Sequence, residues 1–190
     1  EYTEQIKRFN NQLHSLKLLP VPSKDTIKSL EKINKQLEKE IKVLEVKLQT
    51  LLEEWQPAQL KSVGSIKGIG KRATAMLIVF TQGFRHTHSH RQLISFAGLS
   101  PTEYSSGSSI QGRPRIYKRG GKNLRDVLYM CSINAIRTNM ACKTLYERVR
   151  ANGKTGKQAL IAVCNKLLKQ VFAVVKSNSL YQPNYCSPKP

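Results

Sequence analysis

Acidic residues are scarce in the C-terminal two-thirds of this 190-residue chain. Residues 57–190 hold twenty-two lysines and arginines but only three acids, Glu103, Asp126 and Glu147. A metal-dependent nuclease or polymerase site needs several convergent carboxylates to hold its ions. Three scattered acids are a poor basis for such a site. If the chain acts chemically on nucleic acid, the reacting groups must be of another kind or must come from elsewhere.

Long apolar runs and paired cysteine motifs are also missing. We expect neither a membrane span nor a secretory signal, because no long uncharged apolar run and no basic leader before an apolar stretch is present. The cysteines show no CxxC spacing, and the first three lie in helix-like apolar stretches: Cys131, Cys142, Cys164 and Cys186. We interpret them as reduced, packed thiols of a cytosolic protein, with a metal or disulfide role as the alternative.

The chain does have a strong division of charge near Gln56. Residues 1–56 carry ten basic and nine acidic residues, so they form a near-neutral arm in front of a strongly cationic body. A cationic surface of this density attracts polyanions and releases counterions from a phosphate backbone, so nucleic acid is the first partner to consider. The chain starts at Glu1 within a helix-like stretch, and we expect it to be a piece of a longer polypeptide.

In the arm, apolar residues recur at alternating spacings of three and four from Ile27 onward. The two rows are Ile27, Asn34, Ile41 and Leu48, and Leu30, Leu37, Leu44 and Leu51. This pattern is a heptad seam with charged residues around it. Ser23 is suited to cap this helix after Pro20 and Pro22, which break the preceding helix around residues 13–19. We expect the two helical pieces to form an antiparallel hairpin or to pair with a second protomer.

Asn34 is the informative position of this seam. A polar residue in a coiled-coil seam lowers stability but fixes register and oligomer state. The arm therefore predicts a homo-oligomer, a dimer or a tetramer, held together by a coiled coil. An amphipathic helix that packs on its own domain is the alternative.

Residues 60–81 resemble a helix-hairpin-helix, in which a Gly68-Ile69-Gly70 turn joins two short helices. Ile69 would anchor the turn in the core, and the two glycines would permit positive φ and let a phosphate approach the main chain. The free amides and positive dipole end of the second helix would then bind a phosphate without reading a base. Cations flank the turn at Lys67, Lys71 and Arg72. A glycine-rich helix connection without a ligand is the alternative.

Three histidines, His86, His88 and His90, alternate after the apolar helix expected over residues 73–80. On a strand they would share a face, but no carboxylate or thiol lies nearby in the sequence. We interpret them as a polar loop and the cap of a helix over residues 91–96, in preference to a metal site.

Apolar residues at helical spacing predict two core helices further on, around residues 124–136 and 160–174. Between them residues 146–150 continue a shorter helix, and Thr155 is expected to cap the helix that follows. The last stretch, residues 177–190, has three prolines and few core residues, so we expect a loose tail.

The densest functional signal is the loop of residues 98–122. It carries a run of hydroxyls, including Ser105 and Ser106, on a Gly/Ser-rich stretch, followed by clustered cations. The cations are Arg113, Arg115, Lys118, Arg119, Lys122 and Arg125. A hydroxyl that attacks a phosphodiester needs cations to stabilise the developing phosphorane charge, and the arginine fork can hold two phosphate oxygens. A flexible phosphate-binding loop without catalysis is the alternative.

Two local features bound this loop. Gly120 and Gly121 would start the next helix near Lys122, so that its amides add to the same anion site. Ile116 and Tyr117 are expected to pair with the region of Thr102 to Tyr104 in a short hairpin.

Several ordered motifs connect this loop with the segment before it. The order Gly-Leu-Ser-Pro, Ser-Ser-Gly, Lys-Arg-Gly-Gly and Leu-Arg, preceded by Ser-Ile-Lys-Gly-Ile-Gly, lies within about Lys61 to Val175. In this order the chain resembles the C-terminal domain of a class of insertion-sequence transposases. These proteins pair an N-terminal RuvC-like domain bearing four acids with a C-terminal domain bearing a serine, and they include the bridge-RNA-guided recombinases. Residues 8–14 also resemble the start of the family's coiled-coil linker.

The resemblance implies that the serine preceding Gly107, Ser106, is the nucleophile and forms a phosphoserine link to a DNA end, with Ser105 as the neighbouring alternative. It places Mg²⁺ and the activating carboxylates in the RuvC-like domain, which this chain lacks, so the chain itself is expected to hold no cofactor. It implies DNA as the partner, a structured guide RNA in the guided members, and a prokaryotic, nucleoid-associated location in the cytoplasm. We therefore expect these residues alone to bind nucleic acid without cleaving it.

The sequence thus predicts a mainly α-helical protein. A coiled-coil or helical-hairpin arm over residues 1–56 precedes a compact helical transposase domain over residues 57–176, with at most a short β-hairpin, and a loose tail over residues 177–190. The predicted function is the DNA-binding, nucleophile-bearing part of a transposase or site-specific recombinase. A non-catalytic helix-hairpin-helix module that binds DNA or RNA is the competing prediction.

Overall fold

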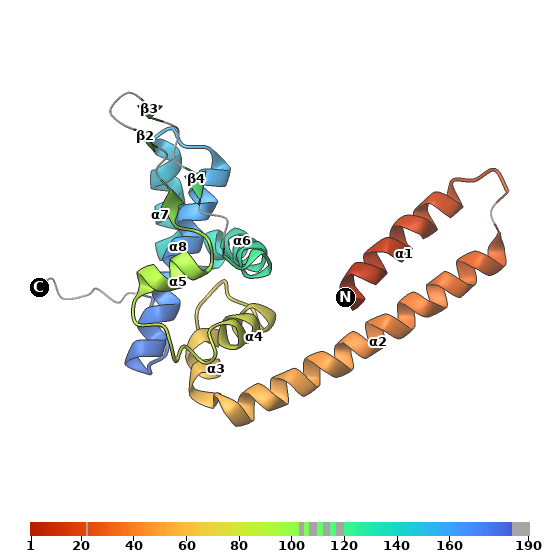
Figure 1. The fold of residues 1–190 in the computed structure, drawn as a ribbon, viewed down its shortest axis with the longest axis horizontal. Helices are drawn as coiled ribbons and strands as arrows, with labels where there is room; N and C mark the ends of the chain where they lie inside the picture. The colour runs from red at the N-terminus through yellow and green to blue at the C-terminus, as the bar shows by residue number, and fades with distance from the viewer. Residues whose placement is uncertain (22, 103–104, 107–109, 112–114, 117–119, 184–190) are drawn as a thin grey trace, which may run out of the picture. The chain divides into compact units, whose positions relative to one another are not determined.

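A computed structural model describes residues 1–21, 23–102, 105–106, 110–111, 115–116 and 120–183. This part of the chain is mainly helical, as predicted, with eight helices and two short β ladders (Figure 1). The chain divides into two compact units, Glu1–Glu54 and Trp55–Pro190.

The first unit is a helical hairpin. Helix α1 (Tyr2–Lys17) lies antiparallel along the first part of helix α2 (Lys24–Trp55) (Figure 1). The Asn34 side-chain amide donates a hydrogen bond to Asn10 Oδ1 over 2.9 Å. One helical turn away, Lys17 Nζ lies 3.1 Å from Glu31 Oε1. Of the two arrangements expected for the arm, the structure therefore shows the antiparallel hairpin within one chain.

Asn34 fixes the register of this hairpin by pairing with Asn10, and it is 6% exposed. The partner helix covers the first half of the heptad rows, where Ile27, Leu30, Leu37 and Ile41 are half-buried. The second half of the rows, Leu44, Leu48 and Leu51, is exposed in the single chain. Association of the arm with a second protomer remains a prediction.

The second unit is built around α8 (Gly156–Ser177). Four helices pack against it: α3 (Pro57–Gly64), α5 (His90–Phe96), α6 (Lys122–Thr138) and α7 (Met140–Ala151). By length and composition alone α8 could cross a membrane. Its buried face is the one predicted from the apolar spacing: Ala159, Val163, Cys164, Leu167, Leu168, Val171 and Val174. Burial against four neighbours is what the core helix of a globular domain requires.

The predicted helix around residues 124–136 is also confirmed. It is α6, whose buried residues include Leu124, Leu128 and Ala135. The short helix expected at residues 146–150 is part of the longer α7, because Asn139 caps a helix that already starts at Met140. Asn139 Oδ1 accepts a hydrogen bond from the Cys142 amide over 3.4 Å.

The predicted cap of α8 is confirmed. Thr155 Oγ1 accepts from the Gln158 amide over 3.4 Å, and Gln158 Oε1 accepts from the Thr155 amide over 2.9 Å. These reciprocal bonds form a capping box. Near the histidines, Ser89 Oγ caps α5 by accepting from the Gln92 amide over 3.2 Å, so the histidine stretch forms a loop and a helix start as interpreted.

The segment after α8 corrects the expectation of a loose tail over residues 177–190 for its described part, and residues 184–190 lie outside the described residues. Tyr181 is docked on the second unit, since its amide donates to Ser65 Oγ over 2.8 Å. Its hydroxyl donates to Asn139 Oδ1 over 3.1 Å and accepts from Gln170 Nε2 over 3.2 Å. Sequence reasoning missed this docking because a single tyrosine in a polar, proline-containing stretch carries no periodic signal.

Candidate nucleic-acid interface

The turn between α3 and α4 (Lys71–Phe80) is the first part of the candidate interface. Helix α4 packs against both α3 and α6. Ile69 anchors the turn as predicted, because it is 7% exposed and its amide donates to the Ile66 carbonyl over 3.1 Å. The Thr74 amide bonds to the Gly70 carbonyl over 3.0 Å, which starts the helical ladder of α4 directly after the turn.

The two glycines of the turn have different roles. Gly68 has a φ of +102°, and a Cβ added there would lie 2.6 Å from Ala135 Cβ on α6. Gly68 is therefore required for a close approach to α6. Gly70 has a φ of −87°, so the expectation of positive φ was wrong for this residue. Nothing lies within 4 Å of a Cβ added at Gly70, so there is open space on that side of the residue.

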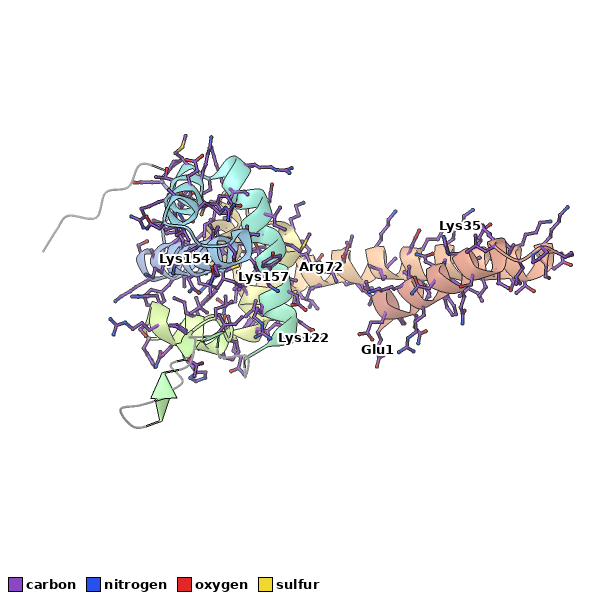
Figure 2. The ribbon with its side chains drawn as sticks, turned by 90° about the horizontal axis from the view of Figure 1, so that it is seen from above. Glu1, Lys35, Arg72, Lys122, Lys154 and Lys157 are labelled. Atoms are coloured by element: carbon purple, nitrogen blue, oxygen red, sulfur yellow. The ribbon has the colours of Figure 1, made fainter. Side chains whose placement is uncertain are left out.

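The start of α4 is a candidate site for an anion. Gly70 is the N-cap and has no side chain to bond the first amides of the helix. These amides lack partners inside the helix and lie at its positive dipole end. Lys67, Lys71 and Arg72 are exposed around them, as Figure 2 shows for Arg72. Main-chain donors and three exposed cations therefore lie together at the turn.

A buried polar network holds the turn from behind. The Asn139 side-chain amide donates to the Lys67 carbonyl over 3.2 Å and to Gln170 Oε1 over 3.1 Å. Because Tyr181 also bonds to Asn139, the network joins the turn, the start of α7, α8 and the C-terminal segment. Sequence reasoning missed Asn139 as part of the site. Its position before a helix indicates a cap, but its contact with Lys67, 72 residues away, has no local signal.

The second part of the candidate interface is the predicted serine loop, which forms a nested pair of β ladders. Strand β1 (Pro101–Thr102) pairs antiparallel with β4 (Arg115–Ile116). The predicted short hairpin is therefore present, but Ile116 lies opposite Pro101 and not opposite residues 102–104. Residues 103–104 and Tyr117 lie outside the described residues. Inside the ladder of β1 and β4, β2 (Ser105–Ser106) pairs antiparallel with β3 (Ile110–Gln111). Ser106 lies opposite Ile110 in the innermost described pair. The main chain of Ser105 and Ser106 therefore lies in the inner ladder, and the outer ladder of β1 and β4 connects it to the rest of the domain. We call these two ladders the serine arm.

The base of this serine arm is closed tightly. A Cβ added at Gly120 would lie 2.3 Å from the Phe96 carbonyl oxygen and 2.3 Å from the Gly98 amide nitrogen. The Gly121 amide also donates to the Phe96 carbonyl over 3.3 Å. The two ends of the loop are therefore in main-chain contact, and only glycine fits at position 120.

The cations predicted around the serine arm have different placements. Lys122 is exposed at the start of α6 (Figure 2). Arg125 is half-buried, and its guanidinium donates to the Ala97 carbonyl over 3.3 Å. Arg125 therefore ties α6 to the base of the arm, besides any contact with a phosphate. Arg115 is described in its main chain, and the remaining three predicted cations lie outside the described residues: Arg113, Lys118 and Arg119.

The two parts of the interface lie at opposite ends of α4. Gly68, before α4, approaches Ala135 near the end of α6. A Cβ added at Gly121, before α6, would lie 3.8 Å from Phe80 at the end of α4. The two helices therefore run antiparallel. At 1.5 Å per residue, the ten residues of α4 separate the two helix starts by about 15 Å.

Comparison with known proteins connects this geometry to a family. Residues 60–147, which include the turn, the serine arm and α6, match the family model described as transposase, IS116/IS110/IS902 family. This segment is an IS116/IS110/IS902-family transposase domain. The resemblance found from the ordered motifs is thereby confirmed at the level of the family.

Three relatives show how much of the whole protein this chain represents. An insertion element IS110 protein of Streptomyces coelicolor is 30% identical over 74% of this chain. Pilin gene-inverting proteins of Moraxella lacunata and Moraxella bovis are each 35% identical over 61% of this chain. The matches span 34% of the first relative and 36% of the other two. The chain therefore matches about a third of the length of these curated relatives.

The cysteines of the transposase domain are buried and unpaired among the described residues. Burial raises the pKa of the Cys142 thiol to about 11 and that of Cys164 to about 12, and it also raises the pKa of Cys131. Protonated thiols in the core are poor metal ligands and poor nucleophiles. The prediction that these three thiols are packed in the core is confirmed, and Cys186 lies outside the described residues.

A metal site in this chain would need several side chains that can coordinate the ion close together. Within the described ranges, no three histidine, cysteine or carboxylate side chains lie close enough together to hold an ion. The residues that are described do not fit a Mg²⁺ site.

Proposed function

We propose that this chain is the DNA-binding, nucleophile-bearing part of a transposase or site-specific recombinase. The observation that carries the proposal is the combination, in one transposase domain, of an anion site at a helix start and a closed arm that carries Ser106. The names of the relatives, an insertion-element protein and pilin gene-inverting proteins, support a role in DNA rearrangement.

The turn between α3 and α4 would hold the DNA backbone as a helix-hairpin-helix does. Its donors are main-chain amides at the start of α4 and the cations Lys67, Lys71 and Arg72. Such donors contact phosphates and carry no base preference. Binding at this turn should therefore be similar for all DNA sequences and should fall steeply with salt.

The serine arm would supply the reacting group. Ser106 Oγ attacks the phosphorus of a DNA phosphodiester, a phosphoserine ester forms, and the P–O bond to the departing strand breaks. The serine proton leaves to a base, and the departing oxygen takes up a proton. Cations near the arm, among them Lys122, would stabilise the charge that develops on the phosphoryl oxygens.

Other parts of the whole protein complete this proposal. The base and the Mg²⁺ expected from the resemblance would come from an acidic RuvC-like domain outside this chain. The same proposal includes association as a dimer or tetramer through the helical arm of residues 1–56. It also includes the use of a structured guide RNA. The 190-residue chain alone should bind DNA and leave it uncut.

The test uses the full-length protein with DNA that carries its recombination site. Ser106→Ala should abolish the covalent protein–DNA adduct seen after denaturing electrophoresis, while DNA binding stays within about twofold. Ser105→Ala is the matched control and should keep the adduct. Adducts that persist in the Ser106→Ala protein would show that another residue is the nucleophile. A loss caused only by Ser105→Ala would move the assignment to the neighbouring serine.

A further inference from the structure

The helical arm has one face made only of lysines, although its net charge is close to zero. Six lysines of α2 recur at spacings of three and four residues: Lys24, Lys28, Lys32, Lys35, Lys39 and Lys42. At 100° per residue they fall within an arc of about 80° of the helix. All six are exposed. We call this set the lysine row.

The lysine row points away from the hairpin's own packing surface. The apolar rows of α2 lie roughly opposite to it, and α1 covers their first half, where Asn34 pairs with Asn10. Figure 2 shows Lys35 at one edge of the arm, and Glu1 of α1 at the other edge. An open depression between the lysines is lined by Lys28, Glu31, Lys32, Lys35, Gln36 and Lys39. The row is therefore free of α1 along its length.

Acids do not neutralise this row. Within the described residues, none of the six lysines takes part in an ion pair. Glu31, at the border of the row, has its carboxylate 3.1 Å from Lys17 of α1. Consecutive lysines of the row are three or four residues apart, so they are neighbours on the helix surface and repel one another.

We propose that the lysine row is a second DNA-binding surface, which contacts the phosphates of a DNA duplex outside the transposase domain. The row extends over 18 residue steps, or about 27 Å at 1.5 Å per residue. The lysines follow one another about every 5.4 Å along the helix, whereas the phosphates of one DNA strand follow one another about every 3.4 Å along the duplex axis. Long, flexible lysine side chains can bridge this difference in spacing. The identity of the polyanion as DNA rests on the proposed function of the transposase domain.

A membrane and an acidic protein fit the row less well. A helix that lies on a membrane needs an apolar face exposed beside its cations, but here the first half of the apolar rows is under α1. An acidic partner would need complementary carboxylates at matched spacing, whereas a duplex presents phosphates continuously. The row would give affinity without sequence preference, since lysines contact phosphates as point charges.

The test measures duplex DNA binding by the whole 190-residue chain as a function of salt. Neutralising four lysines, K28Q/K32Q/K35Q/K39Q, should lower the affinity at least about tenfold at 0.1 M salt. The slope of log affinity against log salt should fall by about 0.9 for each phosphate that the variant no longer neutralises. Unchanged helicity by circular dichroism would show that the variant is still folded.

A pair of matched variants separates the row from net charge. K28Q/K35Q removes two lysines of the row, and K7Q/K47Q removes two exposed lysines of the arm outside it. The first should weaken binding at least about fivefold and the second less than twofold. Equal losses, or an unchanged salt slope in the four-lysine variant, would overturn the proposal. A loss seen on duplex RNA but not on duplex DNA would overturn the assignment to DNA.

The same experiment keeps this inference apart from the proposed function. If the unaltered chain binds no duplex DNA, the DNA-binding role of the transposase domain fails. If it binds DNA and the row variants bind equally well, only the lysine row is refuted.

Discussion

The side-chain amide of Asn139 donates a hydrogen bond to the main-chain carbonyl of Lys67, with 3.2 Å between nitrogen and oxygen. Asn139 is 2% exposed, and it also caps α7 and accepts from the Tyr181 hydroxyl. The core of the domain therefore helps to position the proposed phosphate-binding turn.

Replacing Asn139 should weaken both the fold and DNA binding. Asn139→Ala leaves the Lys67 carbonyl and the Tyr181 hydroxyl without their partner and removes a helix cap. The expected loss is about 2–3 kcal/mol of unfolding free energy. DNA affinity should fall under conditions where the protein is still folded, because the turn loses its tether. Urea denaturation and fluorescence anisotropy with duplex DNA measure the two effects.

Tyr181→Phe is the control for this network. It removes the bond to Asn139 but keeps the bond from Asn139 to Lys67, so it should cost about 1 kcal/mol of stability and leave DNA affinity unchanged. If Tyr181→Phe weakened DNA binding as much as Asn139→Ala, the contact with Lys67 would not be what positions the turn.

The two glycines of the turn should respond differently to alanine. Gly68→Ala forces a Cβ to within 2.6 Å of Ala135 at a φ of +102°, and it should destabilise the domain by about 2–3 kcal/mol. Gly70→Ala meets no atom within 4 Å and should cost less than about 1 kcal/mol as a change of N-cap. Thermal unfolding distinguishes them. Equal losses of stability would contradict the close approach of the turn to α6.

Gly70→Ala then serves as a probe of phosphate approach. An added methyl group beside the first amides of α4 should reduce DNA affinity similarly for unrelated duplex sequences. A reduction confined to one sequence would argue for base reading at this turn.

Closure of the serine arm depends on Gly120. Gly120→Ala places a Cβ 2.3 Å from two main-chain atoms of residues 96 and 98, so the base of the arm must open. Covalent adduct formation by the full-length protein should fall at least about tenfold, because the position of Ser106 relative to the domain changes. Gly64→Ala is the control, since its added Cβ meets no atom within 4 Å and Gly64 has no positive φ. An active Gly120→Ala protein would show that the closed base is dispensable.

The buried cysteines predict a loss of stability in alkali. The pKa of Cys164 is raised to about 12 and that of Cys142 to about 11, from an ordinary value of 9.0. Above pH 9 the unfolded chain releases these protons while the folded chain retains them, so rising pH favours unfolding until the folded values are reached. Urea denaturation under reducing conditions between pH 8 and 11 should show this decline. The decline should be smaller in Cys164→Ala, and an equal decline would assign it to other groups.

The cap of α8 gives a quantitative check on the core helix. Thr155→Ala removes the capping box with Gln158 and should lower the unfolding free energy by about 1 kcal/mol. Thr155→Ser keeps the oxygen and should cost only a few tenths of a kcal/mol. Equal effects of both variants would mean that the methyl group of Thr155, and not its cap, is what stabilises the domain.

Local patterns predicted much of this fold. The spacing of apolar residues predicted α2, α6 and α8, and Thr155 predicted a cap, because these features depend on neighbours within a few residues. Gly68, Ile69 and Gly70 predicted a tight turn for the same reason. Contacts between distant segments had no such signal. Three contacts join segments that are far apart or outside any periodic pattern. They are the bond of Asn139 to Lys67, the docking of Tyr181 and the contact of Gly120 with residues 96–98.

The sequence by itself determined the helical class, the cationic body and the family of the transposase domain, because composition, periodicity and ordered motifs are properties of the chain alone. Only the tertiary structure decided that Gly68 serves packing while Gly70 stays open, and that α4 and α6 run antiparallel with the two parts of the interface at opposite ends. It also placed the six lysines of the arm on a face clear of α1. The physical reason is that a close approach or an exposed face depends on what packs across from a residue, and that partner is set by the whole fold.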